Sequence, residues 1–475
     1  MLKYGTLLLL AVCAAGHAAE FEMAYTNGGG WVWRSPDAWY INKGKAAEVF
    51  PAEGDDVILK PQHNTSNFYL ALQLPTGSPK KDISIKSFNA EIGASVDLQG
   101  KGGVESFSVS GDFIKSVEVE KRNGALVAAH DGNLAIAPFD MKSFLHVKLG
   151  NVILKNEASD KSAIMAFGGN DAYGIFHTHR LLASFKADKI SISNHIVFVA
   201  TENGVNAEIS QITFEGSASG MQGALILNGD NQNEAWQQLQ TIKVGGLQSA
   251  ANGAGIVATK AGSKKIPTKE EARYLPGNFK SDDIIRNGHL EIVGAGGVYS
   301  GEIKDNFQKN DTRGKVHITM NSPGGRQILA GKNSYTGNTY IQNGFLEVNV
   351  SEPLKKFYLR GGALSLAGEN PRISDLYWSS GMLRFDFGRN NTVKISGEIT
   401  LPVEKKNLFE FSNFAPRKTY ILMESETPAE VFNSFKGLKT DFINKADGNA
   451  YTAIFGASDF ALSVVFIPKT ENNAL

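Results

Sequence analysis

The chain has 475 residues, of which 48 are Lys or Arg and 48 are Asp or Glu, so its formal net charge at pH 7 is zero. A chain without net charge has no overall field to attract nucleic acid or an acidic membrane surface, and we expect neither as a partner. Its 50 Gly and 28 Phe residues stand beside plentiful Val, Ile and Leu. This composition suits short strands joined by glycine turns around a large core, and it argues against intrinsic disorder.

The amino end has the layout of a secretory signal peptide. Lys3 precedes an apolar run from Leu7 to Ala15, and small residues follow at Ala18 and Ala19. The run is too short to span a bilayer, and no later stretch reaches the roughly 20 apolar residues that a membrane helix needs. We expect residues 1–19 to be removed and the mature chain to be exported, to the periplasm, the outer cell surface or the extracellular space.

The only cysteine, Cys13, lies in that signal segment. The mature chain therefore has no thiol for catalysis, metal binding or a disulfide. If Leu10 to Cys13 were instead a lipoprotein cleavage site, Cys13 would carry a lipid. Val12 stands where such a site requires a small residue, so the signal peptide is the favoured interpretation.

Short apolar alternations recur about every ten residues along most of the chain, which is the spacing of an all-β protein. A sandwich and a solenoid both give this spacing, but one rhythm continuing over about 300 residues favours stacked coils. Asn-Gly pairs predict turns between the strands; they begin at Asn123, Asn203, Asn228, Asn252, Asn287 and Asn343. The alternating apolar pairs are Ile83 with Ile85, Val96 with Leu98, Phe107 with Val109, Val117 with Val119, Leu134 with Ile136, Val147 with Leu149, Ile190 with Ile192, Ile196 with Phe198, Leu225 with Leu227, Leu290 with Ile292, Val316 with Ile318, and Leu364 with Leu366.

Helical signals are few. Asn233 to Ile242 is compatible with a short helix, and Ala261 to Tyr274 is a polar, Lys-rich insertion; both are expected to project from the stack. Near the carboxyl end, Thr427 and Glu430 have the spacing of a capping box, and Gly437 would end the helix that begins there.

The most informative stretch is GKNSYTGNTYIQNGFLEVNV, from Gly331 to Val350. Asn343 and Gly344 predict a tight turn, and in the strand expected after it Leu346, Val348 and Val350 share one face. Such a turn-strand unit cannot bury its own apolar side, so it must stack on neighbouring units.

Residues 314–348 closely resemble the autotransporter-associated β-strand repeat of bacterial passenger domains. The matching residues are Ile328, Leu329 and Gly331 for the strand and its glycine, Asn333 to Gly337 for the NTYTG core, and Asn343 to Leu346 for the closing NGTL. Residues 27–59, with Trp31, Trp33 and Trp39, resemble the tryptophan-containing start of such proteins. Residues 409–467 resemble their closing coils.

The resemblance implies a right-handed single-stranded parallel β-helix, a solenoid with capped ends. The implied organisation is a signal peptide at 1–19, a Trp-rich cap with the first coils at 20–80, the β-helix at 81–408 with insertions near 228–282, and closing coils with a cap at 409–475. Autotransporters also carry a translocator barrel after the passenger. This chain stops at Leu475 without room for one, so we expect neither self-translocation nor a sorting anchor.

These features predict a secreted or surface-associated, adhesin-like or structural scaffold with no catalytic centre, no cofactor and no metal. Its expected partners are cell-surface or extracellular glycans or proteins. The alternative is a polysaccharide lyase or glycoside hydrolase on the same fold, whose acids meet only in three dimensions. A groove lined by Asp, Glu, Lys or Arg would favour the enzyme, and a face of Asn, Thr and Ser would favour the scaffold.

Two kinds of ionisable grouping in the sequence are candidate sites. His177 and His179 share one strand face near Asp171 and have the donors for a divalent metal, although two surface histidines in a loop is the simpler interpretation. The acidic doublets, Asp55 with Asp56, Glu270 with Glu271 and Asp282 with Asp283, place neighbours on opposite faces or in loops. They predict turns and solvated strand starts rather than a catalytic cleft.

Three aromatic residues in the repeat, Tyr335, Tyr340 and Phe345, are expected to be exposed. They would either form a strip on which sugars or a partner stack, or pack between adjacent corners, and the second interpretation is favoured.

Overall fold

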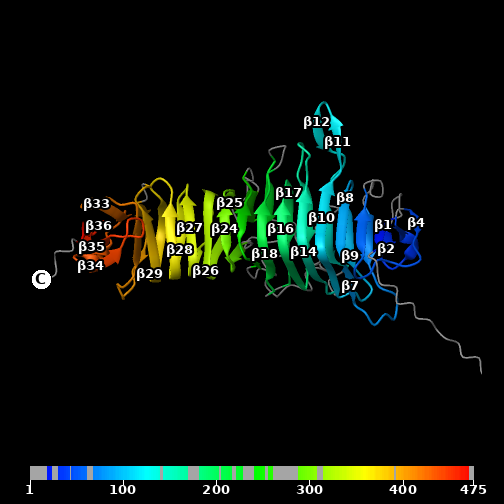
Figure 1. Cartoon of the computed structure of the whole chain (residues 1–475), viewed down its shortest axis with the longest axis horizontal. Coiled ribbons are helices and arrows are strands. Elements are labelled where there is room, and N and C mark those ends of the chain that lie inside the picture. The colour runs from blue at the N-terminus through cyan, green and yellow to red at the C-terminus, as the bar shows by residue number, and fades with distance from the viewer. Residues whose placement is uncertain are drawn as a thin grey trace, which may run out of the picture.

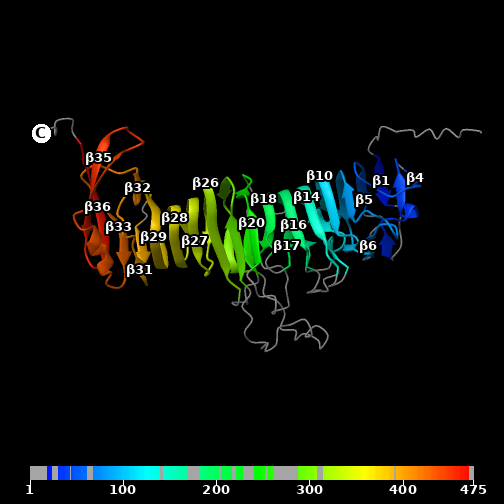
Figure 2. The same cartoon turned by 90° about the horizontal axis from the view of Figure 1, so that it is seen from below.

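The computed structural model shows an elongated rod of strands stacked along its long axis, with β1 (Glu20–Met23) near one end and β36 (Ala461–Pro468) near the other (Figures 1 and 2). Among the described residues, 34 strands belong to one sheet, in which most pairings are parallel. The prediction of an all-β chain is confirmed. The structure describes residues 19–23, 30–42, 44–60, 68–139, 143–168, 181–202, 205–216, 221–227, 240–251, 255–259, 287–307, 314–389 and 392–469.

One long series of strands runs along one side of the rod, each paired in parallel with the next. In order it contains β7 (Asp82–Ile85), β10 (Ser106–Val117), β14 (His146–Lys155), β16 (Ser184–Ile192), β18 (Ala207–Phe214), β20 (Gln240–Val244), β23 (Gly288–Ile292), β26 (Val316–Asn333), β27 (Thr339–Val350), β28 (Leu354–Ala367), β29 (Arg372–Asp386) and β31 (Ile399–Thr400).

A second series alternates with the first along the sequence, and its members also pair in parallel with one another. It contains β2 (Gly30–Val32), β6 (Phe68–Leu72), β9 (Val96–Gly100), β13 (Leu134–Pro138), β15 (Ala163–Phe167), β17 (His195–Val199), β19 (Gly223–Ile226), β22 (Gly255–Thr259) and β25 (Glu302–Asn306). In this second series each strand therefore pairs with a strand that is not its immediate neighbour in sequence.

Shorter members of the same sheet complete these turns. They are β5 (Asp56–Leu59), β8 (Ser87–Ile92), β21 (Leu247–Ser249), β24 (Gly296–Tyr299), β30 (Val393–Ile395) and β32 (Phe409–Ser412). All of these strands form parallel pairs: β5 with β8, β21 with β18, β24 with β26, and both β30 and β32 with β29.

The core is a continuous apolar column along the inside of the rod. Alternate residues of each strand point into it, because successive side chains of a strand face opposite sides. In β27, Leu346, Val348 and Val350 are buried as predicted, while Glu347 and Asn349 are only partly covered. Each inward row of Leu, Ile, Val and Phe continues from strand to strand, and burial of this surface stabilises the stack at roughly 25 cal/mol per Å².

Antiparallel strands close both ends of the rod. At the amino end, β1 pairs with β3 (Trp39–Ile41), which pairs with β4 (Lys45–Ala46). At the carboxyl end, β33 (Thr419–Ser425), β36, β35 (Ala450–Ala457) and β34 (Lys439–Ile443) pair in that order. The antiparallel strands end the parallel sheet at each end of the rod. A sheet edge left open there would offer unpaired backbone groups to a strand of another molecule.

The helix predicted near the carboxyl end exists as a short 3-10 helix, Glu430–Phe435, whose Phe432 and Phe435 are buried. Gly437 follows it with φ of 78°. The capping box is not formed, because the residue at the cap is Ala429 and no side chain caps the helix.

The predicted turn at Asn343 and Gly344 is wrong: both residues lie within the continuous strand β27. Gly344 has φ of 78°, and pairing with β26 resumes on either side of it after register shifts. The pair therefore marks a bend within β27, at the point where its register with the neighbouring strand β26 shifts.

By contrast, Asn123 and Gly124, with φ of 50° and 85°, form the turn of a hairpin, as the sequence predicted. The hairpin consists of β11 (Val119–Arg122) and β12 (Ala125–Ala128), and it projects from the side of the rod (Figure 1). The short helix predicted for Asn233 to Ile242 is wrong for Gln240 to Ile242, which lie in strand β20; its first part falls outside the described residues, as does the insertion at 261–274.

A candidate binding groove on the outer face

A single row of side chains, all of them partly or fully exposed except the buried Thr319, crosses the whole first series of strands. The register of each parallel pair places these residues opposite one another, and successive outward positions therefore stack strand upon strand. We call this row the outer ladder. It consists of Ser84, Ser108, Lys148, Lys186, Glu208, Lys243, Glu291, Thr319, Tyr340, Tyr358, Tyr377 and Thr400.

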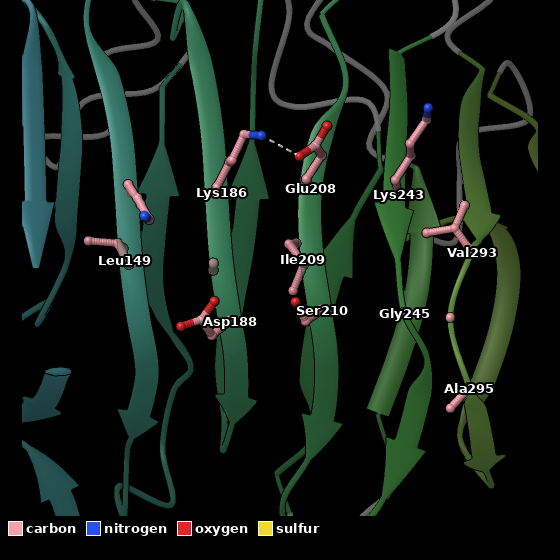
Figure 3. A pocket seen from close by; sticks show the side chains of 13 residues that line it. Leu149, Lys186, Asp188, Glu208, Ile209, Ser210, Lys243, Gly245, Val293 and Ala295 are labelled. Carbon is pink, nitrogen blue, oxygen red and sulfur yellow. Dashed lines mark ion pairs between the residues drawn. The ribbon is translucent and has the colours of Figure 1, made fainter. Parts of the chain in front are cut away.

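The first half of the outer ladder lies in two adjoining hollows, of about 770 and 590 Å³. The larger hollow lies over β7, β10, β14 and β16, and the smaller one over β14, β16, β18 and β20 (Figure 3). Lys148 and Lys186 line both hollows, so the two form one groove along the rod. We call it the outer groove.

The smaller hollow is charged. Lys186 Nζ lies 2.7 Å from Glu208 Oε2, as Figure 3 shows, and Lys243 Nζ lies 3.8 Å from Glu291 Oε2 on the next strand along. The side chains of Lys186 and Glu208 are 57 and 51% exposed. An exposed pair of this kind contributes about 0–1 kcal/mol, because water already solvates both charges. Such pairs can therefore rearrange around a ligand at little cost.

The larger hollow has a mixed lining of apolar, charged and hydroxyl-bearing side chains. Its serines include Ser84 and Ser108 of the outer ladder. Beside them, His146 Nδ1 lies 2.9 Å from Ser184 Oγ, and Ser106 Oγ donates a hydrogen bond of 2.6 Å to Asp82 Oδ1. Hydroxyl and imidazole groups in a row can donate hydrogen bonds to a polyhydroxylated ligand and accept hydrogen bonds from it.

Three successive members of the second half of the outer ladder, Tyr340, Tyr358 and Tyr377, form a tyrosine stack. The ring centroids of Tyr340 and Tyr358 are 4.8 Å apart, and those of Tyr358 and Tyr377 are also 4.8 Å apart, with interplanar angles of 18° and 14°. Arg360 lies over the first two rings, with its guanidinium carbon 5.5 and 5.3 Å from their centroids. Because the ring faces cover one another, mostly the edges and hydroxyl groups remain for solvent or a ligand.

Hydrogen bonds fix the two ends of this stack. Tyr377 donates from its hydroxyl to Glu398 Oε2 at 2.9 Å, and this bond raises the pKa of Tyr377 above its usual value. At the other end Asn338 Nδ2 donates to the Tyr340 hydroxyl at 2.9 Å. The stack is therefore a built structural element and not a loose aromatic surface.

The aromatic residues singled out from the sequence have different environments. The expected exposure of Tyr335 is wrong, because its side chain is fully buried and its hydroxyl lies 2.7 Å from Thr339 Oγ1. Phe345 is 9% exposed, between the guanidinium groups of Arg326 and Arg384. Both residues are therefore packed within the structure and do not form an exposed strip on which a ligand could stack.

The sequence predicts both Asp55 and Asp56 as turn residues, but Asp56 is the first residue of strand β5. Asp55 accepts a 2.9 Å hydrogen bond from the backbone of Ala52, and Asp56 begins β5 and accepts one of 2.6 Å from Ser87 Oγ. The remaining candidates, His177, His179, Asp171, Glu270, Glu271, Asp282 and Asp283, lie outside the described residues.

Sequence reasoning missed the outer groove. The lysines and glutamates of the outer ladder share one local signal: each stands between two inward apolar residues, as in Val147-Lys148-Leu149. The number of residues between successive ladder positions differs at every step, however, because the connections between strands differ in length. No fixed spacing in the sequence therefore groups Lys148 with Lys186.

Within the described part of the chain, no group of three or more His, Cys, Asp or Glu side chains is arranged to hold a metal ion. Over the same residues, no helix has both the length and the apolar character needed to cross a bilayer. In comparisons with protein-family models, curated proteins and solved structures, no match is found for this chain.

Proposed function

We propose that this protein is an exported bacterial scaffold of the adhesin-like, passenger-like type, built as a right-handed single-stranded parallel β-helix, and that it binds an extended polymer along its outer groove without a catalytic centre. The two alternating series of parallel strands support the β-helix. The right-handed sense follows from the strong preference of parallel crossovers, about 98% of which are right-handed.

The single observation that carries the binding proposal is that the first half of the outer ladder, from Ser84 to Lys243, lies along the outer groove. Strands of a parallel sheet repeat about every 4.8 Å, so the groove offers one polar side chain per strand at a regular interval. A repeating polymer such as a glycan chain has a comparable interval between its units and can make the same kind of contact many times. A straight groove across at least six strands suits such a ligand better than it suits a small molecule.

A polysaccharide-active enzyme is the second candidate, and the charged hollow is the observation that favours it. The groove carries charged side chains in both hollows, and serine hydroxyl groups are more numerous in the larger one. Glycoside hydrolysis requires two carboxyl groups in place, one as acid and one as base or nucleophile. In the smaller hollow the acids are Asp188 and Glu208, and Glu208 is paired with Lys186. The scaffold is therefore the favoured proposal.

The test is binding of the mature chain, residues 20–475, to a panel of glycan polymers, with product release measured in the same samples. Ser108→Trp fills the floor of the groove, and Ser351→Trp is the matched control, since Ser351 is exposed in a turn after β27. We expect saturable binding that Ser108→Trp abolishes and Ser351→Trp preserves, without release of oligosaccharides.

Two outcomes would contradict the scaffold proposal. Turnover of a polymer that is lost in Asp188→Asn would identify the enzyme instead. An absence of binding to every polymer, or equal binding by the two Trp variants, would remove the groove from the function.

Export is tested separately by fractionation of the producing cell and sequencing of the mature amino terminus. We expect the chain outside the cytoplasm, beginning at Ala19 or Glu20. A cytoplasmic chain that retains Met1 would contradict this part of the proposal.

A further inference from the structure

We propose that the middle of the outer groove is an anion subsite formed by Lys148 and Lys186, so that the polymer bound there is an acidic polysaccharide carrying carboxylate groups. This inference rests on the proposed polymer binding and names its ligand class. Lys148 and Lys186 are directly opposite in the register of β14 and β16, and both are exposed. They are also the two residues that the hollows share.

The order of charges on the outer ladder singles out this position. From Lys186 the signs alternate along Glu208, Lys243 and Glu291, and the ion pairs join Lys186 to Glu208 and Lys243 to Glu291. Lys148 breaks the alternation, because its neighbours on the ladder are Ser108 and Lys186. It makes no ion pair with any residue that the structure describes.

Two like charges directly opposite each other on adjacent strands destabilise a sheet, because their side chains are only about 5 Å apart at the Cβ atoms. A ligand carboxylate between the two ammonium groups would replace this repulsion by two attractions. Ser184 and His146, one outward position earlier on the same two strands, lie 2.9 Å apart and can supply further hydrogen bonds. The groove thus already contains the partners for one anionic group.

The remaining charges of the groove indicate how densely charged the ligand is. Besides the lysine pair, the lining contains Lys80 and Lys243, and it also contains four acids, namely Glu53, Asp82, Asp188 and Glu208. A polymer with a charge on every unit, such as a nucleic acid, would meet these carboxylates and be repelled. A sugar chain with carboxylates at intervals can place one between the lysines and its hydroxyl groups against the acids and serines.

The experiment compares acidic polymers with the same polymers after neutralisation. Hyaluronan, alginate and polygalacturonate are each tested beside their methyl esters, which keep the sugar backbone and remove the charge. We expect at least one acidic polymer to bind and its methyl ester to bind about tenfold more weakly, as expected when one charge-assisted contact is lost. Binding of the acidic form should also weaken at high salt, because the subsite is exposed.

The variants locate the effect. Lys148→Gln should weaken binding of the acidic polymer about tenfold and leave binding of the ester unchanged. Lys148→Arg should retain most of the affinity. Lys121→Gln is the matched control, since Lys121 is exposed on the projecting hairpin. Unchanged melting temperatures would show that the variants remain folded.

The outcomes separate this inference from the proposal on which it rests. The anion subsite is wrong, and polymer binding stands, if neutral polymers bind as tightly as acidic ones. The same conclusion follows if Lys148→Gln does not weaken the binding of a polymer whose binding Ser108→Trp abolishes. If no polymer binds, both fail. If single-stranded DNA binds more tightly than every glycan and Lys148→Gln removes that binding, the polysaccharide assignment is overturned.

Discussion

Lys115 Nζ lies 2.7 Å from Nε2 of His195 in the interior of the rod, although the two residues are 80 positions apart in the sequence. Both side chains are fully buried. His195 Nδ1 donates to the carbonyl oxygen of Ser193 at 2.8 Å, which leaves Nε2 to accept from Lys115. Burial lowers the pKa of Lys115 well below its usual range, and burial together with the nearby lysine lowers that of His195.

This pair makes the stability of the protein depend on pH. Both groups bind protons more weakly in the folded chain than in the unfolded chain. Stability rises with pH wherever the unfolded state binds more protons. The contribution of His195 is therefore lost as the pH falls below its ordinary pKa of about 6.5, and that of Lys115 as the pH falls below about 10.5. We expect the free energy of unfolding to increase between pH 5 and pH 10.

Urea unfolding at a series of pH values measures this dependence. Lys115→Met alone would leave Nε2 of His195 without its donor, so the informative variant is Lys115→Met combined with His195→Leu. Removing both groups should reduce the slope, by at most about 1.4 kcal/mol per pH unit for each group. A double variant whose stability varies with pH like that of the natural chain would show that the pair does not titrate as proposed.

The tryptophans that resemble a cap should hold the amino end together. Trp33 is fully buried, donates from Nε1 to the carbonyl oxygen of Pro51 at 3.1 Å and packs against Trp39 with ring centroids 5.1 Å apart. Trp33→Ala should therefore cost about 3–5 kcal/mol. Tyr40→Ala is the control: its side chain is 37% exposed, and we expect a change within about 0.5 kcal/mol. Equal effects in denaturant unfolding would contradict the capping role.

Close backbone contact between Gly331 in β26 and Gly301, which precedes β25, requires glycine at position 331. A Cβ atom on Gly331 would lie 1.9 Å from the carbonyl oxygen of Gly301. Gly331→Ala forces the backbone apart and should destabilise by at least about 1–3 kcal/mol. Gly456→Ala is the comparison, because there the added methyl group would meet only the side chain of Ser463. If calorimetry shows the same melting temperature for both variants, the stacking at this position is looser than described.

The tyrosine stack makes a prediction that separates ring contacts from hydroxyl contacts. Tyr358 stacks on Tyr340 and Tyr377, and no hydrogen bond of its hydroxyl to another described residue is found. Tyr358→Ala removes two ring pairs of about 0.5–1.5 kcal/mol each and should destabilise by about 1–3 kcal/mol. Tyr358→Phe keeps both ring pairs and should be nearly neutral. A large loss in the Phe variant, measured by thermal unfolding, would reveal a role for the hydroxyl instead.

The strand pattern was predictable because it is local. Leu346, Val348 and Val350 face the core since side chains of a strand alternate, and this holds whatever lies on the next coil. The corner at Asn343 and Gly344 was not predictable, because a glycine with positive φ serves equally in a hairpin turn and in a bend of a continuous strand. Only the strand beneath it decides between the two.

The sequence by itself determined the all-β class, the stacking of short strands and the inward face of each strand, because backbone sterics and alternation of apolar residues act over a few positions. The tertiary structure alone decided which outward residues become neighbours. Lys148 lies opposite Lys186, and Lys115 lies beside His195, because strands joined by connections of different lengths come together in the sheet. The register of that pairing depends on the summed packing of many strands, which no short stretch of sequence contains.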